Sequence, residues 1–235
     1  MKFITLVKKE LFESRYWLLL AFLIMLLWSY WHVNEMYMSR LKDLDCSFYI
    51  RRFTLAAAIP KYYLSYGNYF LSFYGVLIPW ASAVLGLIFA VQQFWVPSLK
   101  RTWAFLLHRP VNRRTVICSK ITAAAIGLFV IIGVIWCGVF WRINQFAPVF
   151  MFSLRDFIVG WLHISAGLIV YLGCALAAIS SGKWHIKRFF ALGISALILL
   201  RFFNLSTISA AVIMLIFGFI LLGVQLFYTF INKEF

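Results

Sequence analysis

Two residues of this chain suggest catalytic chemistry by their types alone, His163 and Ser165. A histidine that stands near a serine can activate the hydroxyl as a nucleophile. Residues two apart on a helix point to different faces, however, and no Gly-x-Ser-x-Gly sequence surrounds the serine. A membrane enzyme therefore stays an alternative, and we assign no catalytic residue.

The sequence also lacks the motifs that are typical of nucleotide and metal sites. Residues 180–183 read Ser-Ser-Gly-Lys, but the phosphate-loop spacing G-x-x-x-x-G-K-[ST] is absent. The zinc-binding sequence H-E-x-x-H is absent as well. Cys46, Cys118, Cys137 and Cys174 show no C-x-x-C or other metal spacing. We expect neither a nucleotide site nor a metal site in this chain.

Arg201 is the clearest charge inside an apolar segment, near the outer third of its predicted span. Ionisable groups within a bilayer are costly and are functional candidates by default. Its guanidinium could contact an anionic lipid or substrate group, or Asp156, whereas snorkelling to the outer headgroups is the alternative. Tyr66 and Tyr69 precede the second apolar segment and are typical of an interfacial aromatic belt. A role in binding a ligand is the alternative for the two tyrosines.

The composition decides the class of protein. Hydrophobic residues make up 64% of the 235 residues and charged residues only 12%, which excludes a soluble globular protein. One helical span needs about 20 apolar residues, so the length allows roughly six spans with short loops. We expect a single all-α transmembrane domain with spans at residues 16–33, 70–94, 115–141, 157–181, 189–205 and 206–231.

The charge of the chain, +15, is interpreted as a topology signal and not as a nucleic-acid footprint. Residues 1–15 predict an interfacial amphipathic helix. Its apolar side holds Phe3, Leu6, Val7 and Leu11, and its polar side holds Lys2, Lys8, Lys9, Glu10 and Glu13. Basic residues in the inner segments outnumber those in the outer segments when both termini are cytoplasmic, which is the orientation we predict.

A second pattern concerns packing within the fourth span. Gly160, Gly167 and Cys174 recur every seven residues and so form a narrow face of small side chains. Another helix can approach such a face closely. We expect this face to pack within the chain or across a dimer.

A polar island at residues 96–120 separates two long apolar segments. Leu99, Trp103, Leu106 and Leu107 recur at i, i+4, i+7 and i+8, the spacing of one apolar helix face. We predict a short amphipathic helix at residues 98–109, with Ser98 as its N-cap and Pro110 after its end. Asn112 is then placed to cap the following helix. The island has no acidic residue and carries Lys100, Arg101, Arg109, Arg113, Arg114 and Lys120.

The core of this island carries the one family resemblance in the chain. Residues 102–113 read Thr-Trp-Ala-Phe-Leu-Leu-His-Arg-Pro-Val-Asn-Arg, and Lys120 follows. This resembles the cytoplasmic signature of permease subunits of type-two ABC exporters, Gly-Thr-x-x-x-Leu-Leu-x-x-Pro-Val-Ser-Arg with a later Lys. The chain departs from that signature at Arg101 and Asn112, and it lacks the usual upstream acidic residue. A basic loop that lies in the interface is the simpler alternative.

The resemblance implies a function for the island and for the chain. The short helix would be a coupling helix that docks on a separate ABC ATPase subunit, which itself binds ATP and Mg. A second permease copy or a homologue would complete the path in the cytoplasmic membrane of a prokaryote, for a hydrophobic or amphipathic lipid, peptide or drug. The other interpretation is a stand-alone membrane protein, either an intramembrane enzyme or an immunity-type factor. In an exporter, Arg201, Tyr66 and Tyr69 would lie along the outer part of the translocation path. The expected contacts with the ATPase are Leu99, Arg101, Trp103, Phe105, Leu106 and Arg109.

Overall fold

The computed structural model describes residues 2–50, 77–100, 112–146, 154–180, 185–203 and 207–232, and the secondary structure in these ranges is helical. A helix at residues 77–90 runs into two short elements, η1 and α3. The bounds of the elements are α1 (Lys2–Ile50), η1 (Val91–Trp95), α3 (Val96–Leu99), α5 (Arg113–Phe146), α6 (Leu154–Ile179), α7 (His185–Phe203) and α8 (Ile208–Asn232).

Five helices of the described residues are long and apolar enough to cross a membrane: Phe3–Trp31, Leu77–Leu99, Arg113–Trp141, Leu154–Ile179 and Ile208–Asn232. This confirms the predicted all-α membrane protein. The helix at the fifth predicted span, residues 189–205, has a shorter apolar part, Phe190–Phe203. The Leu77–Leu99 helix extends five residues past the predicted end of the second span, residue 94.

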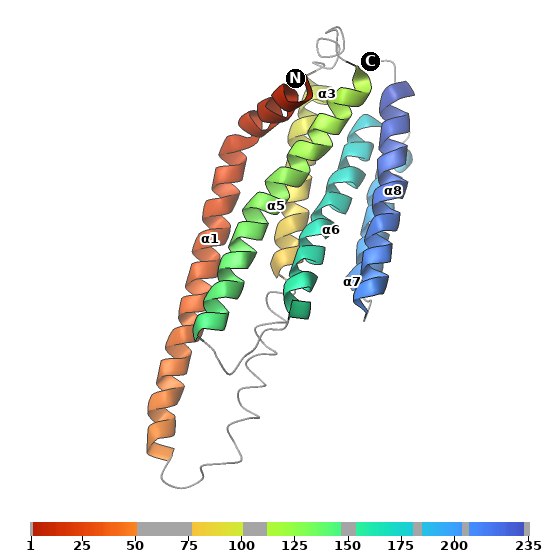
Figure 1. Cartoon of the computed structure of the whole chain (residues 1–235). Helices are drawn as coiled ribbons and strands as arrows, with labels where there is room; N and C mark the ends of the chain where they lie inside the picture. The colour runs from red at the N-terminus through yellow and green to blue at the C-terminus, as the bar shows by residue number, and fades with distance from the viewer. Residues whose placement is uncertain are drawn as a thin grey trace.

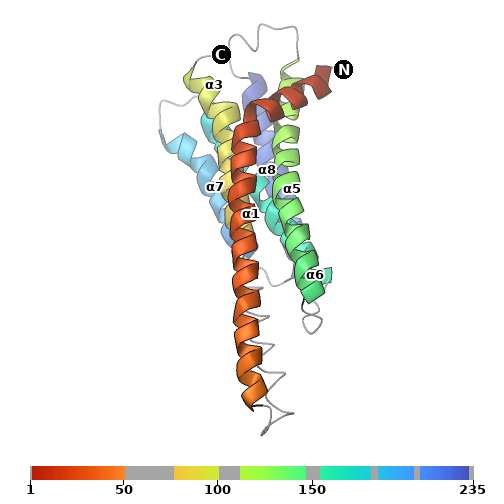
Figure 2. The ribbon, with the colours of Figure 1, turned by 90° about the vertical axis from the view of Figure 1, so that its left-hand side faces the viewer.

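The helices pack side by side, and the two chain ends lie at the same end of the bundle, which we call the upper end (Figure 1). The predicted interfacial helix at residues 1–15 is continuous with the first span, because α1 is one helix from Lys2 onward. Its first turns nevertheless bend away from the long axis of α1 (Figure 2). The other end of α1 extends well past the bundle.

The helices differ strongly in burial. In α6, 72% of the most apolar window is buried, whereas the figure for α1 is 11%. α6 is therefore the central helix of the bundle, and α1 is a peripheral helix that packs chiefly on α5. α1 touches the bundle through one stripe of buried residues: Val7, Glu10, Ser14, Met25 and Ser29.

The predicted small-residue face of α6 is confirmed as a packing face, and it is used within the chain. A Cβ atom added to Gly167 would lie 2.5 Å from the carbonyl oxygen of Ser82, and one added to Gly86 would collide with the carbonyl oxygen of Gly167. A Cβ atom on Gly160 would collide with the indole of Trp136. The backbones of α6 and of the Leu77–Leu99 helix are thus in direct contact near the middle of the bundle.

Three tryptophans of the bundle are strongly exposed. Trp80 and Trp141 lie near the lower ends of their helices, and Trp31 ends the apolar part of α1; the three are 69%, 68% and 62% exposed. Tryptophan is enriched at membrane–water interfaces. At 1.5 Å per helical residue, Trp80 lies about 30 Å below Lys100, and Trp141 lies about 30 Å below Lys120, close to the thickness of the hydrocarbon core. These two lysines are therefore about one hydrocarbon thickness above the two tryptophans.

Candidate functional site

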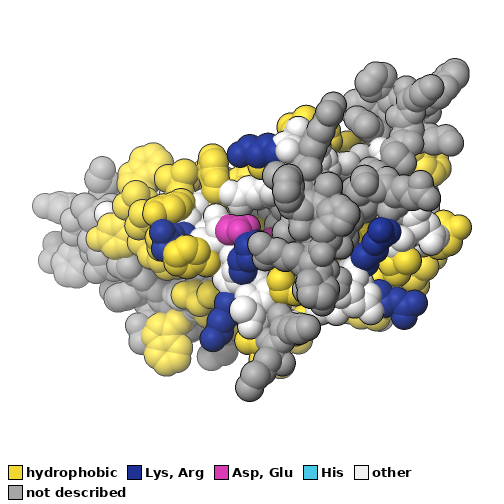
Figure 3. All heavy atoms as spheres, turned by 90° about the horizontal axis from the view of Figure 1, so that it is seen from above, with side chains coloured by type: hydrophobic (Ala, Val, Ile, Leu, Met, Phe, Trp, Pro, Cys, Tyr) yellow, Lys and Arg dark blue, Asp and Glu magenta, His cyan; other side chains and the backbone are white. Residues whose placement is uncertain are grey.

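The upper end of the bundle carries many of the exposed basic side chains of the described residues. Figure 3 shows Lys and Arg side chains spread over this end, with an acidic side chain beside one of them. Lys8, Lys100 and Arg114 are exposed there, and Arg113 is half-buried. The two described borders of the polar island, Lys100 and Asn112, belong to this end, so the predicted coupling segment is attached here.

The structure describes only the first residues of the predicted coupling helix, 98–109. Leu99 is 78% exposed at the end of α3. Ser98 lies inside the last turn of that helix and not at the N-cap of a new one, because the Lys100 N–H still donates to the carbonyl oxygen of Val96 at 3.0 Å. Apart from Arg201, the other predicted contact and path residues lie outside the described ranges: Arg101, Trp103, Phe105, Leu106, Arg109, Tyr66 and Tyr69.

The far border of the island begins α5 as predicted. The Asn112 Oδ1 atom accepts a hydrogen bond from the Arg114 N–H at 3.0 Å, and the Asn112 carbonyl oxygen accepts from the Thr115 N–H at 2.9 Å. A side-chain oxygen that binds an otherwise unpaired N–H of the first helical turn is an N-cap. Asn112 is therefore confirmed as the cap of α5, which fixes where this helix begins within the island.

Arg113 joins this start of α5 to the end of α8. Its Nη1 atom donates a hydrogen bond of 3.0 Å to the carbonyl oxygen of Ile231. The last carbonyls of a helix lack partners within the helix and carry partial negative charge, so a guanidinium is a favourable partner for them. A signature residue of the island thus holds two helix ends together.

Lys120 joins α5 to α1 through a buried ion pair. Its Nζ atom lies 2.7 Å from Glu10 Oε1, and the two side chains are 3% and 11% exposed. The sequence analysis placed Glu10 on the polar face of the N-terminal helix, and the structure corrects this: Glu10 lies on the buried stripe that faces α5. The sequence did contain a signal for this buried position. Glu10 lies three residues after Val7 and four residues before Ser14, the spacing of one helix face.

The η1 turn lies next to this ion pair. Lys120 Nζ is 5.8 Å from the centre of the Phe94 ring, within the range of a cation–π contact. The Tyr171 hydroxyl donates to Gln93 Oε1 at 2.6 Å, and the Phe94 and Tyr171 rings meet edge to face at 6.0 Å. We call the four buried residues Glu10, Gln93, Lys120 and Tyr171 the polar layer. It connects α1, η1, α5 and α6 near the upper end of the bundle.

Two atoms beside the polar layer have no hydrogen-bond partner among the described residues. They are Gln92 Oε1 and Gln93 Nε2, and both are buried. Buried polar atoms without partners are uncommon in folded proteins, because the group loses water and gains nothing. The two glutamines belong to η1, so among the described residues this turn holds two buried polar atoms without a partner.

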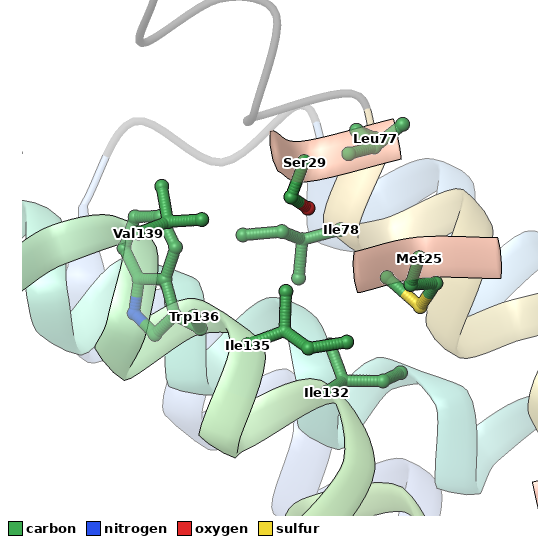
Figure 4. A pocket seen from close by; sticks show the side chains of 8 residues that line it. All are labelled: Met25, Ser29, Leu77, Ile78, Ile132, Ile135, Trp136 and Val139. Carbon is green, nitrogen blue, oxygen red and sulfur yellow. The ribbon is translucent and has the colours of Figure 1, made fainter. Parts of the chain in front are cut away.

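A small apolar pocket lies at the other end of the α1 contact (Figure 4). It has a volume of about 10 Å³, space for roughly one water molecule. Ser29 faces it, and the Ser29 Oγ atom is buried without a partner among the described residues. A single water could satisfy this hydroxyl, but the pocket is too small for a substrate. Its lining residues are Met25, Ser29, Leu77, Ile78, Ile132, Ile135, Trp136 and Val139.

The remaining polar residues from the sequence analysis lie apart from the polar layer. Arg201 is exposed in the last turn of α7, and it forms no ion pair with Asp156 in the described part of the chain. The ring of His163 packs against Phe202 at 5.7 Å, while Ser165 Oγ donates to the carbonyl oxygen of Trp161 at 2.9 Å. His163 and Ser165 therefore have separate partners.

Comparison with known proteins leaves the family open. The chain matches no protein-family model, no curated protein and no solved structure. The described residues bring both borders of the island to the upper end and connect each border to other helices.

Proposed function

We propose that this chain is the membrane-spanning subunit of an ATP-driven ABC exporter of the type-two class. The observation that carries the proposal is the buried ion pair of Lys120 with Glu10, at 2.7 Å. Lys120 is the lysine that closes the resemblance to the exporter signature. The pair connects α5, the helix that follows the segment that would dock on an ATPase, to α1.

The proposed mechanism uses rigid connections on both sides of the island. An ATPase that closes on ATP would push the segment at residues 98–109. The push would pass through the start of α5 to α1 by way of Glu10, and to α8 by way of Arg113. It would also pass through η1 to α6, where Tyr171 binds Gln93. Such movement of packed helices is a common route for switching between two states.

Six crossings complete the proposed architecture. α7 has 19 residues and is about 28 Å long, close to the thickness of the hydrocarbon core. Counting it as a span gives an even number of crossings, in agreement with two chain ends at the same end of the bundle (Figure 1). The basic upper end would face the cytoplasm by the positive-inside rule, with both termini there.

The proposal assigns partners and a class of substrate. ATP and Mg would be bound by the ATPase subunit, and a second permease copy or homologue would form the other half of the path. The substrate would be hydrophobic or amphipathic, a lipid, a peptide or a drug. Arg201, Tyr66 and Tyr69 are the proposed residues along the outer part of the path. Leu99, Arg101, Trp103, Phe105, Leu106 and Arg109 are the proposed contacts with the ATPase.

The decisive experiment is co-purification followed by mutation of the island. A gently solubilised complex is expected to contain an ATPase of the Walker type. Trp103→Ala combined with Leu106→Ala is expected to abolish the stimulation of that ATPase by the permease while the permease stays folded. The matched control is Ile213→Ala with Ile216→Ala, a pair with the same spacing that is 67% and 53% exposed on α8.

Two results would contradict the proposal. One is a pure permease that brings no ATPase from the membrane under any mild detergent. The other is labelling of single cysteines introduced at residues 101–109 by a reagent that reaches only the external side of the membrane. Loss of a hydrolase activity on replacement of His163 and Ser165 would favour the enzyme alternative instead.

A further inference from the structure

The η1 turn has a local cause in the sequence. Pro97 lies in the first turn of α3, and the Val96 N–H before it donates to the carbonyl oxygen of Val91, five residues back. A proline inside a helix has no N–H to donate, and its ring collides with the carbonyl four residues earlier. Here that carbonyl belongs to Gln93, and widening the turn into a π-helix moves it away. The π turn is therefore one of two ways in which this helix can accommodate Pro97.

The other way is a kink. Sharp bends in helices occur at proline and at π turns, because both interrupt the regular ladder of hydrogen bonds. A proline-kinked α-helix would contain the same residues without the widened turn. The residues after the turn would then rotate by about 100° and advance by about 1.5 Å relative to those before it. The sequence around Pro97 is compatible with either form.

The helix is fixed below the turn. At Gly86 the backbones of the Leu77–Leu99 helix and α6 are in direct contact, and Ser82 Oγ donates to the carbonyl oxygen of His163 at 3.0 Å. No side chain separates the two backbones at this contact, so the lower part has no space in which to slide. Above the turn, Leu99 and Lys100 are exposed. A change at η1 would therefore move the upper part, which leads into the island.

Two hydrogen bonds hold the π form against α6. The Tyr171 hydroxyl binds Gln93 at 2.6 Å, and the Trp95 indole N–H reaches the Cys174 carbonyl oxygen at 3.3 Å. Gln92 Oε1 and Gln93 Nε2, which have no partner among the described residues, oppose this form, because a rearrangement could give them partners. Two hydrogen bonds thus favour the π form, and the two buried polar atoms raise its free energy. This balance is what we expect of an element with two states.

We propose that the turn Val91–Trp95 is a two-state joint, which alternates between the observed π form and a helix kinked at Pro97. Movement of the joint swings residues 96–100 and with them the attached end of the island. Its use in transport rests on the function proposed above, whereas the two states themselves do not. The hydrogen bond from Tyr171 to Gln93 is the latch of the π form.

Amide hydrogen exchange of the full-length permease in lipid nanodiscs, without any ATPase, tests the joint. Peptides that cover residues 91–96 are compared with those that cover residues 125–129 of α5. The two segments lie at similar distances along their helices from Lys100 and Lys120, respectively. We expect the amides of the joint to exchange at least about tenfold faster, because each passage between the two forms opens their hydrogen bonds. Equal protection in the two segments would overturn the proposal.

Variants of the joint sharpen this test. Pro97→Ala is expected to slow exchange at residues 91–96 about tenfold or more, since alanine allows one regular α-helix. The matched control is Pro79→Ala in the same helix, which should leave exchange at residues 91–96 unchanged. No slowing in Pro97→Ala would overturn the proposal.

The latch provides a second variant that does not depend on how Pro97→Ala folds. Tyr171→Phe removes only the hydroxyl and with it the hydrogen bond to Gln93. It should speed exchange at residues 91–96 by about threefold to tenfold, the factor that corresponds to the free energy of one hydrogen bond. An unchanged rate would overturn the joint even if an ATPase co-purifies. Conversely, if exchange is fast but no ATPase co-purifies with the permease from the membrane, the joint is supported and the missing ATPase counts against the exporter.

Discussion

The basic residues at the upper and lower ends of the bundle differ in their partners. At the upper end, Lys120 and Arg113 are used to tie helices together, one to Glu10 and one to the last carbonyls of α8. At the lower end, Arg201 is exposed in the last turn of α7 and forms no ion pair with Asp156 within the described residues. The difference shows that a basic residue near a span end can be a structural tether or a surface charge, and that only its partners distinguish the two.

The largest effect is expected at the buried ion pair. Lys120→Met leaves the Glu10 carboxylate buried without its partner, which should reduce the free energy of unfolding by about 3–5 kcal/mol. The measurement is unfolding of the purified protein in mixed detergent micelles. Glu10→Leu combined with Lys120→Met should recover most of the loss, because no buried charge remains. A single variant as stable as the parent would show that the pair does not tether α1.

A somewhat smaller effect is expected between the two ends, at the close contact of α6. A methyl group at Gly167 would lie 2.5 Å from a backbone oxygen, so Gly167→Ala must push two helices apart at a cost of about 1–3 kcal/mol. Gly193→Ala in α7 is the control, because a methyl group there meets nothing within 4 Å. The same unfolding assay compares them. Equal stabilities of the two variants would mean that the helices can separate freely.

The tether at α8 should be weaker than the ion pair. Arg113 is half-buried, so Arg113→Met should lower the free energy of unfolding by about 1 kcal/mol through loss of the hydrogen bond to Ile231. Arg114→Met next to it removes an exposed arginine and should change stability by less than about 0.5 kcal/mol. If both variants behave alike, Arg113 acts only as a surface charge of the basic end.

The smallest effect on stability is expected at the lower end. Arg201→Gln should change the free energy of unfolding by less than about 0.5 kcal/mol, since the side chain is exposed. Transport by the assembled complex is the second measurement. Unchanged transport would support snorkelling to the headgroups, and a loss of transport without a loss of stability would place Arg201 on the path. A loss of stability above about 1 kcal/mol would contradict the contrast between the two ends.

The sequence predicted those features that depend on neighbours along one helix. The apolar runs specify membrane helices, and the repeat of Gly160, Gly167 and Cys174 predicted the close-packing face of α6. Asn112 was correctly predicted as a helix cap, because its partners are its own next residues. For the predicted coupling contacts at residues 101–109, the sequence pattern is still the basis of the assignment.

Tertiary structure decided the features that join distant residues. Glu10 and Lys120 are 110 residues apart, and only the packing of α1 on α5 turns an expected surface carboxylate into the buried partner of Lys120. The π form of Val91–Trp95 likewise depends on Tyr171 of α6 as well as on Pro97. Periodicity and capping are local properties that the order of residues fixes. The partner of a buried charge depends on which helices meet and at what height, which no single helix encodes.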